Sequence, residues 1–254
     1  MKTLIITVAG TATRFNRDTS RDTLKCLYFQ ENPQYSLLYQ ILDKARDIDK
    51  YVIVGGYLFE ELSVFIDDYL REFKDKIELV YNAHYKDYGS GYSLIKGIAA
   101  VPSGCDEIIF VEGDLFYDEY SFRKVFSSCH NVITASREFI TSQKAVVLYV
   151  DMAGHIHYLY DTNHLSLNIS EPFQAIYNSA QIWKFLSVEK LYSVIGNLTP
   201  VQVCGTNLEI IQGYFGDLLL DEVEFIPIET WYNCNTVFDY NTVYSLIKQH
   251  ENNQ

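Results

Sequence analysis

The sequence lacks the features that mark disulfide-rich, zinc-binding or membrane-spanning proteins. Its cysteines are scattered, odd in number and never spaced C-x-x-C: Cys26, Cys105, Cys129, Cys204 and Cys234. This distribution argues against a disulfide framework and a zinc site, and it favours a reducing compartment. No apolar stretch approaches the roughly 18 residues that a membrane-spanning helix needs. We therefore expect a cytoplasmic protein without membrane insertion.

Basic residues are also scarce, with 20 Lys and Arg against 33 Asp and Glu and a formal net charge of −13. A nucleic-acid binder normally carries a basic field that offsets phosphate charge, so we expect no nucleic-acid partner. A local basic pocket for a phosphorylated small molecule is compatible with this balance. The 5 prolines and 13 glycines form no linker-like cluster. We therefore expect a single domain over residues 1–254.

Hydrophobic residues make up 48% of the chain, an ordinary share for a globular protein. In the first half, continuous apolar and β-branched runs predict strands at residues 4–8, 51–54, 77–81 and 108–111. Between them, apolar stripes at helical spacing predict helices at residues 37–45, 62–70 and 92–100. Strand–helix alternation of this kind predicts an α/β fold, with a Rossmann-like, mostly parallel sheet and helices on both faces.

The second half has a mixed pattern. Two strand-like runs at 145–150 and 156–160 flank Asp151-Met152-Ala153-Gly154 and predict a smaller antiparallel hairpin region. Further on, we expect a strand at 224–228 and helices that begin at 187 and span 208–220 and 237–248. No internal repeat is present. The hairpin predicts that the sheet is mixed rather than purely parallel.

The first strand-to-helix connection is the most informative segment for chemistry. It reads Ala9-Gly10-Thr11-Ala12-Thr13-Arg14-Phe15. A loop of small residues after a buried strand lets backbone N–H groups approach phosphate oxygens, and Arg14 adds a planar cation. Neither the Rossmann G-x-G-x-x-G pattern nor the Walker A pattern is present. Taken alone, the loop is equally typical of a tight turn with a surface arginine.

The order of the motifs that accompany this loop is more specific. It runs Ala9-Gly10-x-x-x-Arg14-Phe15, then Lys25, Gly113-Asp114 and Asn235-Thr236-x-x-Asp239. This set, which spans nearly the whole chain, resembles the nucleotidyltransferase superfamily with a GT-A-like fold. Within it, the chain is most similar to small enzymes related to choline-phosphate cytidylyltransferase and sugar-1-phosphate nucleotidyltransferases.

The resemblance implies a role for each matching residue. It makes Lys25 and Arg14 catalytic, with Lys25 neutralising the α-phosphate, and it makes Asp114 and Asn235 the ligands of a Mg²⁺ cofactor. The residues that would bind the nucleotide are Ala9, Gly10, Thr11, Ala12, Thr13, Arg14, Lys25, Gly89, Ser90, Gly91 and Ser93. Two positions depart from the family pattern, because Ala12 replaces the loop's second glycine and Leu24 replaces the usual proline before the lysine.

The reaction implied by the resemblance is transfer of a nucleoside monophosphate from an NTP to a small phosphorylated acceptor, with release of pyrophosphate. CTP is the favoured nucleotide, since the short chain resembles the choline-phosphate type, and the product would be an activated head group or sugar for surface glycan or lipid synthesis. Residues 1–130 would be the nucleotide-binding half and residues 131–254 the acceptor-binding half. Two alternatives stay open: a GT-A glycosyltransferase that uses a nucleotide-sugar donor, and a non-catalytic nucleotide-binding regulatory protein.

Other candidate motifs have simpler interpretations. Thr236-x-x-Asp239 resembles a helix capping box, so we interpret Asp239 as structural. Ser187-x-x-Lys190 matches a serine-acylase pattern but lacks its partner motifs, and we interpret it as a helix N-cap. His155 and His157 alternate on one strand face, without an obvious third metal ligand.

Tyrosine is abundant, with 21 residues. Seven of them could line an acceptor pocket that binds a quaternary ammonium group through aromatic faces: Tyr81, Tyr85, Tyr88, Tyr92, Tyr158, Tyr160 and Tyr177. Tyrosine also fills ordinary strand and helix surfaces, and this is the interpretation that we prefer.

Overall fold

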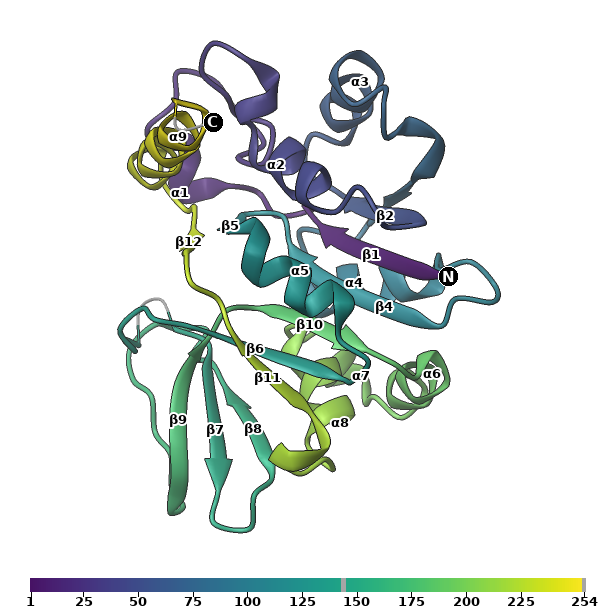
Figure 1. Ribbon diagram of the computed structural model, residues 1–254, viewed down its shortest axis with the longest axis vertical. Coiled ribbons are helices and arrows are strands. Elements are labelled where there is room, and N and C mark those ends of the chain that lie inside the picture. The colour runs from purple at the N-terminus through teal and green to yellow at the C-terminus, as the bar shows by residue number, and fades with distance from the viewer. Residues whose placement is uncertain (143–144, 253–254) are drawn as a thin grey trace.

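The computed structural model describes residues 1–142 and 145–252, and its described strands form one ten-stranded sheet and one two-stranded sheet (Figure 1). In spatial order the large sheet contains β3 (Ile77–Tyr81), β2 (Lys50–Gly55), β1 (Lys2–Thr7), β4 (Glu107–Glu112), β10 (Ile182–Phe185), β6 (Val132–Ser136), β9 (Phe173–Ser179), β7 (Val147–Asp151) and β8 (Ile156–Leu159), with β11 (Glu224–Pro227) paired to β6. The small sheet pairs β5 (Leu115–Tyr117) with β12 (Trp231–Asn233). The large sheet therefore runs through both halves of the chain.

The four strands predicted in the first half form the parallel part of the sheet. β1 lies between β2 and β4, with Ile6 opposite Ile53 on one side and Val111 on the other. Leu4 and Ile6 are fully buried toward one face, and Ile5 is fully buried toward the opposite face. Because both faces are covered, the strand reads as a continuous apolar run rather than an alternating one. This explains why the sequence predicted these strands correctly.

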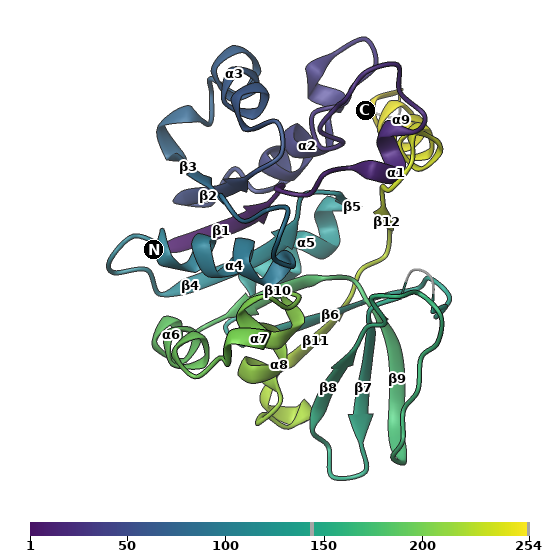
Figure 2. The same ribbon diagram turned by 180° about the vertical axis from the view of Figure 1, so that it is seen from behind.

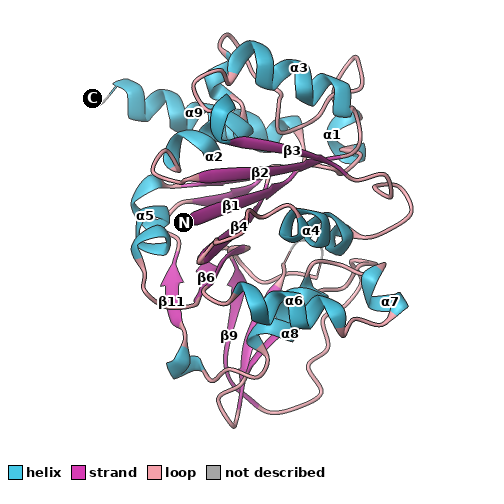
Figure 3. Ribbon diagram, turned by 90° about the vertical axis from the view of Figure 1, so that its right-hand side faces the viewer, coloured by secondary structure: helices cyan, strands magenta, loops and turns pink. Residues whose placement is uncertain are grey.

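Helices cover both faces of the sheet, as predicted (Figures 2 and 3). One core cluster packs three helices against the face that carries Leu4: α2 (Leu37–Lys44), α3 (Phe59–Tyr69) and α5 (Glu119–Ser127). The other cluster packs three helices against the face that carries Ile5: α4 (Ser90–Ala99), α6 (Val188–Gly196) and α8 (Leu208–Phe215). The remaining α-helices are α1 (Thr13–Asn16), α7 (Pro200–Val203) and α9 (Val237–Asn252).

The antiparallel part of the sheet is larger than the predicted hairpin. The hairpin itself is confirmed, with Leu148 of β7 opposite Tyr158 of β8. β9 extends it along the other edge of β7, and β10 joins the antiparallel part to the parallel part through β4. At that junction the Trp183 and Phe110 rings stack 5.5 Å apart. The helix predicted over 208–220 is shorter, since α8 ends at Phe215.

Both predicted helix caps are present. Ser187 caps the N-terminus of α6, where its hydroxyl accepts a hydrogen bond from the Lys190 backbone N–H at 3.1 Å. Thr236 and Asp239 exchange side-chain-to-backbone hydrogen bonds at the start of α9, at 3.2 and 2.8 Å. These contacts confirm a structural role for Asp239.

His155 and His157 both contact a third side chain, Asp151. The Asp151 Oδ2 atom lies 3.3 Å from His155 Nδ1 and 3.0 Å from His157 Nε2, at the end of the hairpin remote from the parallel strands. Within residues 1–142 and 145–252, no group of three or more His, Cys, Asp or Glu side chains is arranged to hold a metal ion. In the same residues, no helix is both long and apolar enough to cross a membrane.

Candidate active site

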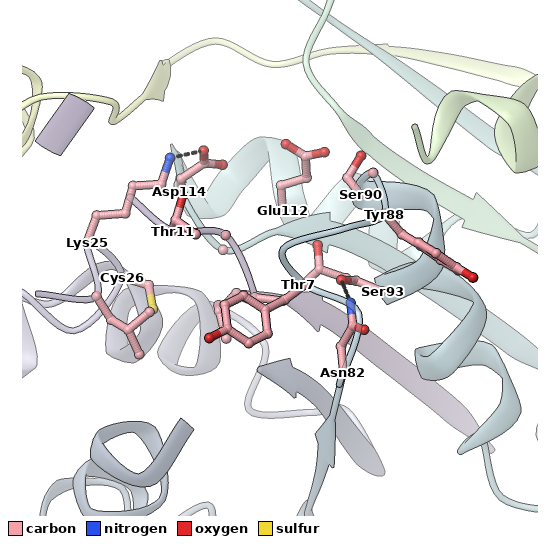
Figure 4. A pocket seen from close by; sticks show the side chains of 17 residues that line it. Thr7, Thr11, Lys25, Cys26, Asn82, Tyr88, Ser90, Ser93, Glu112 and Asp114 are labelled. Atoms are coloured by element: carbon pink, nitrogen blue, oxygen red, sulfur yellow. Dashed lines mark hydrogen bonds and ion pairs between the residues drawn. The ribbon is translucent and has the colours of Figure 1, made fainter. Parts of the chain in front are cut away.

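A pocket of about 320 Å³ lies at the carboxyl ends of the parallel strands (Figure 4). Its walls come from the segments after β1, β3 and β4 and from the first turns of α4. Seventeen residues line it: Thr7, Val8, Ala9, Gly10, Thr11, Leu24, Lys25, Cys26, Asn82, Tyr85, Tyr88, Gly89, Ser90, Ser93, Glu112, Gly113 and Asp114. Open α/β sheets bind their ligands at this edge, so the pocket is the first candidate site.

The loop after β1 is fixed by its neighbours and open on the pocket side. Val8 N–H donates to the Val54 carbonyl at 2.8 Å, and Gly113 N–H donates to the Thr7 carbonyl at 3.0 Å. A Cβ atom on Gly10 would meet no atom within 4 Å, which leaves room for a ligand above the loop. Ala12 adopts a left-handed backbone with φ 51° and ψ 31°. Such a conformation favours glycine, the residue that the resembled family has there.

Four of the predicted site residues form one hydrogen-bonded network. Lys25 Nζ donates to Asp114 Oδ2 at 2.5 Å and to Asn235 Oδ1 at 3.2 Å. Arg14 Nη2 donates to the same Asn235 oxygen at 2.9 Å. The residues come from α1, from the segment before α2, and from the loops that follow β4 and β12. The fold thus brings together two cationic side chains and two oxygen-bearing side chains that are far apart in sequence.

The Asp114 and Asn235 side chains fit a Mg²⁺ ion. Both present an oxygen to the same Lys25 ammonium group, so the two oxygens lie close enough to share a cation. The second carboxylate oxygen, Asp114 Oδ1, is buried and has no hydrogen-bond partner in the part of the chain that the structure describes. Magnesium favours carboxylate and carbonyl oxygens and retains several waters. Two protein ligands would therefore suffice if nucleotide phosphates supplied others.

Glu112 is a site residue that sequence analysis missed. Its Oε1 atom accepts a hydrogen bond from Asn207 Nδ2 at 2.5 Å, and the side chain lies beside Asp114 in the pocket (Figure 4). Burial of the carboxyl group raises its pKa, and the negative charge of Asp114 raises it further. The sequence feature that could have identified Glu112 is its position at the carboxyl end of an apolar strand, two residues before Asp114.

Asn82 is a second missed residue, on the opposite wall of the pocket. It is 1% exposed, and its side chain donates to Ser93 Oγ at 2.9 Å and accepts from the His84 backbone N–H at 2.8 Å. These bonds fix the orientation of Ser93, which was predicted to contact the nucleotide. Tyr88 lies nearby and stacks on the His84 ring at 4.5 Å.

Gly89 and Gly91 have a packing role that the sequence did not predict. Gly89 N–H donates to the Cys204 carbonyl at 2.9 Å, and Gly91 N–H donates to the Gly205 carbonyl at 3.1 Å. A Cβ atom on Gly91 would lie 2.7 Å from the Thr206 carbonyl oxygen. The close approach of the loop between α7 and α8 therefore requires a residue without a side chain. Gly89 and Ser90 also line the pocket, whereas Gly91 does not.

A second cavity of about 220 Å³ adjoins the first, and both are lined by Lys25, Ser90, Glu112 and Asp114. Its other described lining residues are Arg14, Val146, Tyr160, His164, Gln181, Thr206, Asn207, Leu208, Asn233 and Asn235. Most of them come from the second half of the chain. The Lys25–Asp114 pair therefore lies where the two cavities meet.

Three of the predicted nucleotide-binding residues line neither cavity: Ala12, Thr13 and Gly91. The seven tyrosines considered from the sequence are dispersed. Tyr85 and Tyr88 line the first cavity, and Tyr160 lines the second. The other four pack elsewhere, where Tyr81 contacts Phe59, Tyr92 contacts His84, Tyr158 accepts from Trp183 Nε1, and Tyr177 contacts Phe225.

Several solved structures of similar fold are named as nucleotidyltransferases. One is assigned as a glucose-1-phosphate thymidylyltransferase from Bacillus anthracis, in complex with sucrose (17% identity, TM-score 0.68, 97% of this chain and 95% of that chain). Another is the inositol-1-phosphate CTP transferase from T. maritima (15%, 0.67, 98% and 95%). A third is the CTP:phosphocholine cytidylyltransferase from Streptococcus pneumoniae (19%, 0.61, 97% and 99%). The predicted nucleotidyltransferase fold is therefore confirmed.

At the level of sequence, no curated protein matches this chain. A family does match it, over residues 21–247, which include Lys25, Asp114 and Asn235. The chain therefore belongs to the family described as "Domain of unknown function (DUF6564)".

Proposed function

We propose that this protein transfers a nucleoside monophosphate from an NTP to a small phosphorylated acceptor and releases pyrophosphate. The observation that carries this proposal is the Lys25–Asp114 pair, 2.5 Å apart, at the junction of two adjoining cavities. A site for two phosphorylated substrates needs cations between them, and Lys25 and Arg14 supply these. The three similar structures, named for thymidylyl or CTP transfer, support the same reaction class.

We assign the two cavities to different substrates. All described residues that line the first cavity fall between positions 7 and 114, which fits residues 1–130 as the nucleotide-binding half. The second cavity draws Tyr160, His164 and Gln181 from residues 131–254, which fits an acceptor-binding half. The sheet runs through both halves, so we treat residues 1–254 as one functional unit.

The reaction needs little covalent chemistry from the protein. An acceptor phosphate oxygen attacks the α-phosphorus in line, and the bond to the leaving pyrophosphate breaks. Lys25 and Arg14 would neutralise the charge that builds on the phosphate oxygens, and the two cavities would hold the reactants in line. An entering triphosphate would draw Lys25 away from Asp114.

Magnesium fits this scheme as a cofactor held by Asp114 and Asn235. When bound, it would supply additional positive charge to the phosphate oxygens. Asp114 contributes a negative charge and Asn235 contributes a neutral oxygen, so the protein part of the site is sparse. We therefore propose that the metal site is completed by the phosphates of the nucleotide.

CTP remains our proposed nucleotide, because two of the similar structures described above are named for CTP. The remaining one is named for thymidylyl transfer, so the test must include other bases. The test offers four NTPs with Mg²⁺ to the purified protein, each with a panel of phosphorylated alcohols and sugars, and records pyrophosphate.

We expect pyrophosphate release that requires both an NTP and a phosphorylated acceptor, and we expect Asp114→Asn to abolish it. Lys74→Met, at an exposed ion pair with Asp67, is the control that should retain it. Tight NTP binding without pyrophosphate would instead indicate a regulatory protein. Release of a nucleoside diphosphate from a nucleotide sugar would indicate a glycosyltransferase.

A further inference from the structure

Gln181, which lines the second cavity, combines two unusual features. It lies between β9 and β10, is 4% exposed, and adopts a left-handed backbone with φ 57°. Its Nε2 atom is buried and has no hydrogen-bond partner among the described residues. A strained backbone and a buried unpaired donor are each destabilising, and such features concentrate at functional sites.

The backbone around Gln181 is fixed from several sides. Gln181 N–H donates to Ser179 Oγ at 3.1 Å, and Ala180 N–H donates to the Thr134 carbonyl at 3.1 Å. The Ala180 carbonyl accepts from Trp231 Nε1 at 2.7 Å. These bonds hold the residue in its left-handed conformation, so the backbone at this point of the cavity wall is rigid.

The other amides around this cavity are already engaged. Asn235 Oδ1 accepts from both Arg14 and Lys25, and Asn207 Nδ2 donates to Glu112. Gln181 therefore differs from them, since its buried donor has no partner in the described chain. Gln181 lines the second cavity, so a ligand bound there is the candidate partner for this donor.

His164 repeats the same features on another wall. It has φ 59°, lines the cavity, and has a buried Nδ1 atom without a partner in the described part of the chain. Its ring packs edge-on against Tyr160 at 5.6 Å. Amide and imidazole nitrogens pair well with hydroxyl groups, which can both donate and accept.

A quaternary ammonium group would suit this cavity poorly. Such a group makes no conventional hydrogen bonds and prefers several aromatic faces, whereas Tyr160 is the one tyrosine among the described lining residues. Binding it would leave the Gln181 donor buried and unpaired. A site built to bind a hydroxyl discriminates strongly against ligands that lack it.

We infer that Gln181 selects a phosphorylated sugar or polyol as the acceptor, by donating from Nε2 to one of its hydroxyl oxygens. The inference rests on the proposed function, and it names the acceptor class for the same site. Arg14 and Lys25 face the phosphate of this acceptor, and Gln181 with His164 faces its hydroxylated carbon chain.

The test measures acceptor binding by calorimetry, with Mg²⁺ and a non-hydrolysable CTP analogue present. The probes are glucose 1-phosphate, glycerol 3-phosphate, ribitol 5-phosphate and choline phosphate. Gln181→Gly keeps the left-handed backbone at no steric cost and removes the amide. Gln181→Asn retains an amide on a shorter chain. Asn178→Ala is the matched control, because Asn178 is also a buried amide with an unpartnered atom but lines neither cavity.

We expect at least one hydroxylated probe to bind more tightly than choline phosphate. Gln181→Gly should weaken that binding about 10-fold, since a donor to the ligand is lost. Gln181→Asn should lie between, and Asn178→Ala should match the wild type. Affinity for the CTP analogue should be unchanged in all three variants.

The inference is wrong if choline phosphate binds best, if no hydroxylated probe binds, or if Gln181→Gly leaves the affinity unchanged. The pyrophosphate assay separates this failure from failure of the proposed function. Turnover of choline phosphate would leave nucleotidyl transfer standing and overturn only the acceptor class. Absence of pyrophosphate with every NTP and acceptor would overturn the proposed function itself.

Discussion

Lys25 Nζ lies 2.5 Å from Asp114 Oδ2, so the proposed phosphate-binding cation is paired with the proposed metal-binding carboxylate. The two side chains are 22% and 15% exposed, respectively. The ammonium group therefore lies between Asp114 and Asn235, where the proposed metal ion would bind. Nucleotide and metal would displace this contact together, which couples their binding.

This coupling predicts opposite effects of Lys25→Met on metal binding and on turnover. Removal of the ammonium group should tighten Mg²⁺ binding in the absence of nucleotide, because the cation no longer competes for Asp114. It should lower kcat by about 100- to 1,000-fold through loss of a preorganised charge. Calorimetric Mg²⁺ titration and pyrophosphate kinetics measure the two effects, with Lys74→Met as control. Near-normal turnover would remove Lys25 from the proposed mechanism.

Asp239→Ala should act on stability more than on metal binding. Asp239 Oδ2 accepts from the backbone N–H groups of Asn235 and Thr236 at 3.0 and 2.8 Å, so its loss should cost about 1 kcal/mol of unfolding free energy. Urea unfolding measures this cost. Mg²⁺ binding with CTP should weaken less than in Asn235→Ala. If Asp239→Ala lost the metal while Asn235→Ala kept it, Asp239 would be the ligand.

Ala12→Gly should stabilise the protein slightly. At φ 51° an alanine side chain is strained by about 1–2 kcal/mol, while the greater freedom of glycine in the unfolded chain offsets part of the gain. A net gain of about 0.5 kcal/mol is expected in urea unfolding. The control is Ala99→Gly at the end of α4, where the same substitution in a helical conformation should destabilise. Destabilisation by both substitutions would argue against the left-handed loop.

The hairpin remote from the site predicts a pH effect on stability. Hydrogen bonds from His157, and then from the backbone and ring of His155, hold the pKa of Asp151 well below its usual range. A carboxyl group whose pKa is lowered by folding stabilises the fold above its unfolded pKa, near 4, and this stabilisation is lost as the pH falls below that value. Asp151→Asn should therefore flatten the loss of stability between about pH 4 and pH 2 in urea unfolding. An equally steep loss in the variant would contradict this assignment.

The parallel half of the fold was predictable because strands buried on both faces of a sheet appear in the sequence as continuous apolar runs. Leu4 and Ile6 face one helix layer and Ile5 the other, so the run is continuous and distinct from a surface strand. β9 and β10 were missed. β9 begins with the exposed residues Phe173 and Gln174, so its apolar positions do not alternate cleanly.

The candidate site was also predictable only in part. Asp114 follows a recognisable strand, and the carboxyl end of such a strand is where α/β proteins bind ligands. Glu112 ends the same strand, but a charged residue there is also typical of solvent exposure. Gln181 could not be identified from the sequence, because it lies in a turn between two strands that were not predicted. The left-handed backbone position is also occupied by glutamine, not by the glycine or asparagine that usually marks it.

The central claim is that the bond broken lies between the α- and β-phosphates and that the α-phosphate moves to the acceptor. The most direct measurement uses CTP labelled at the α-phosphorus, with Mg²⁺ and a phosphorylated sugar or polyol that supports turnover. We predict that the label appears in a CMP-linked acceptor in a one-to-one ratio with pyrophosphate, and that Asp114→Asn forms neither. Label retained in CDP with release of orthophosphate, or label never leaving CTP, would contradict the account.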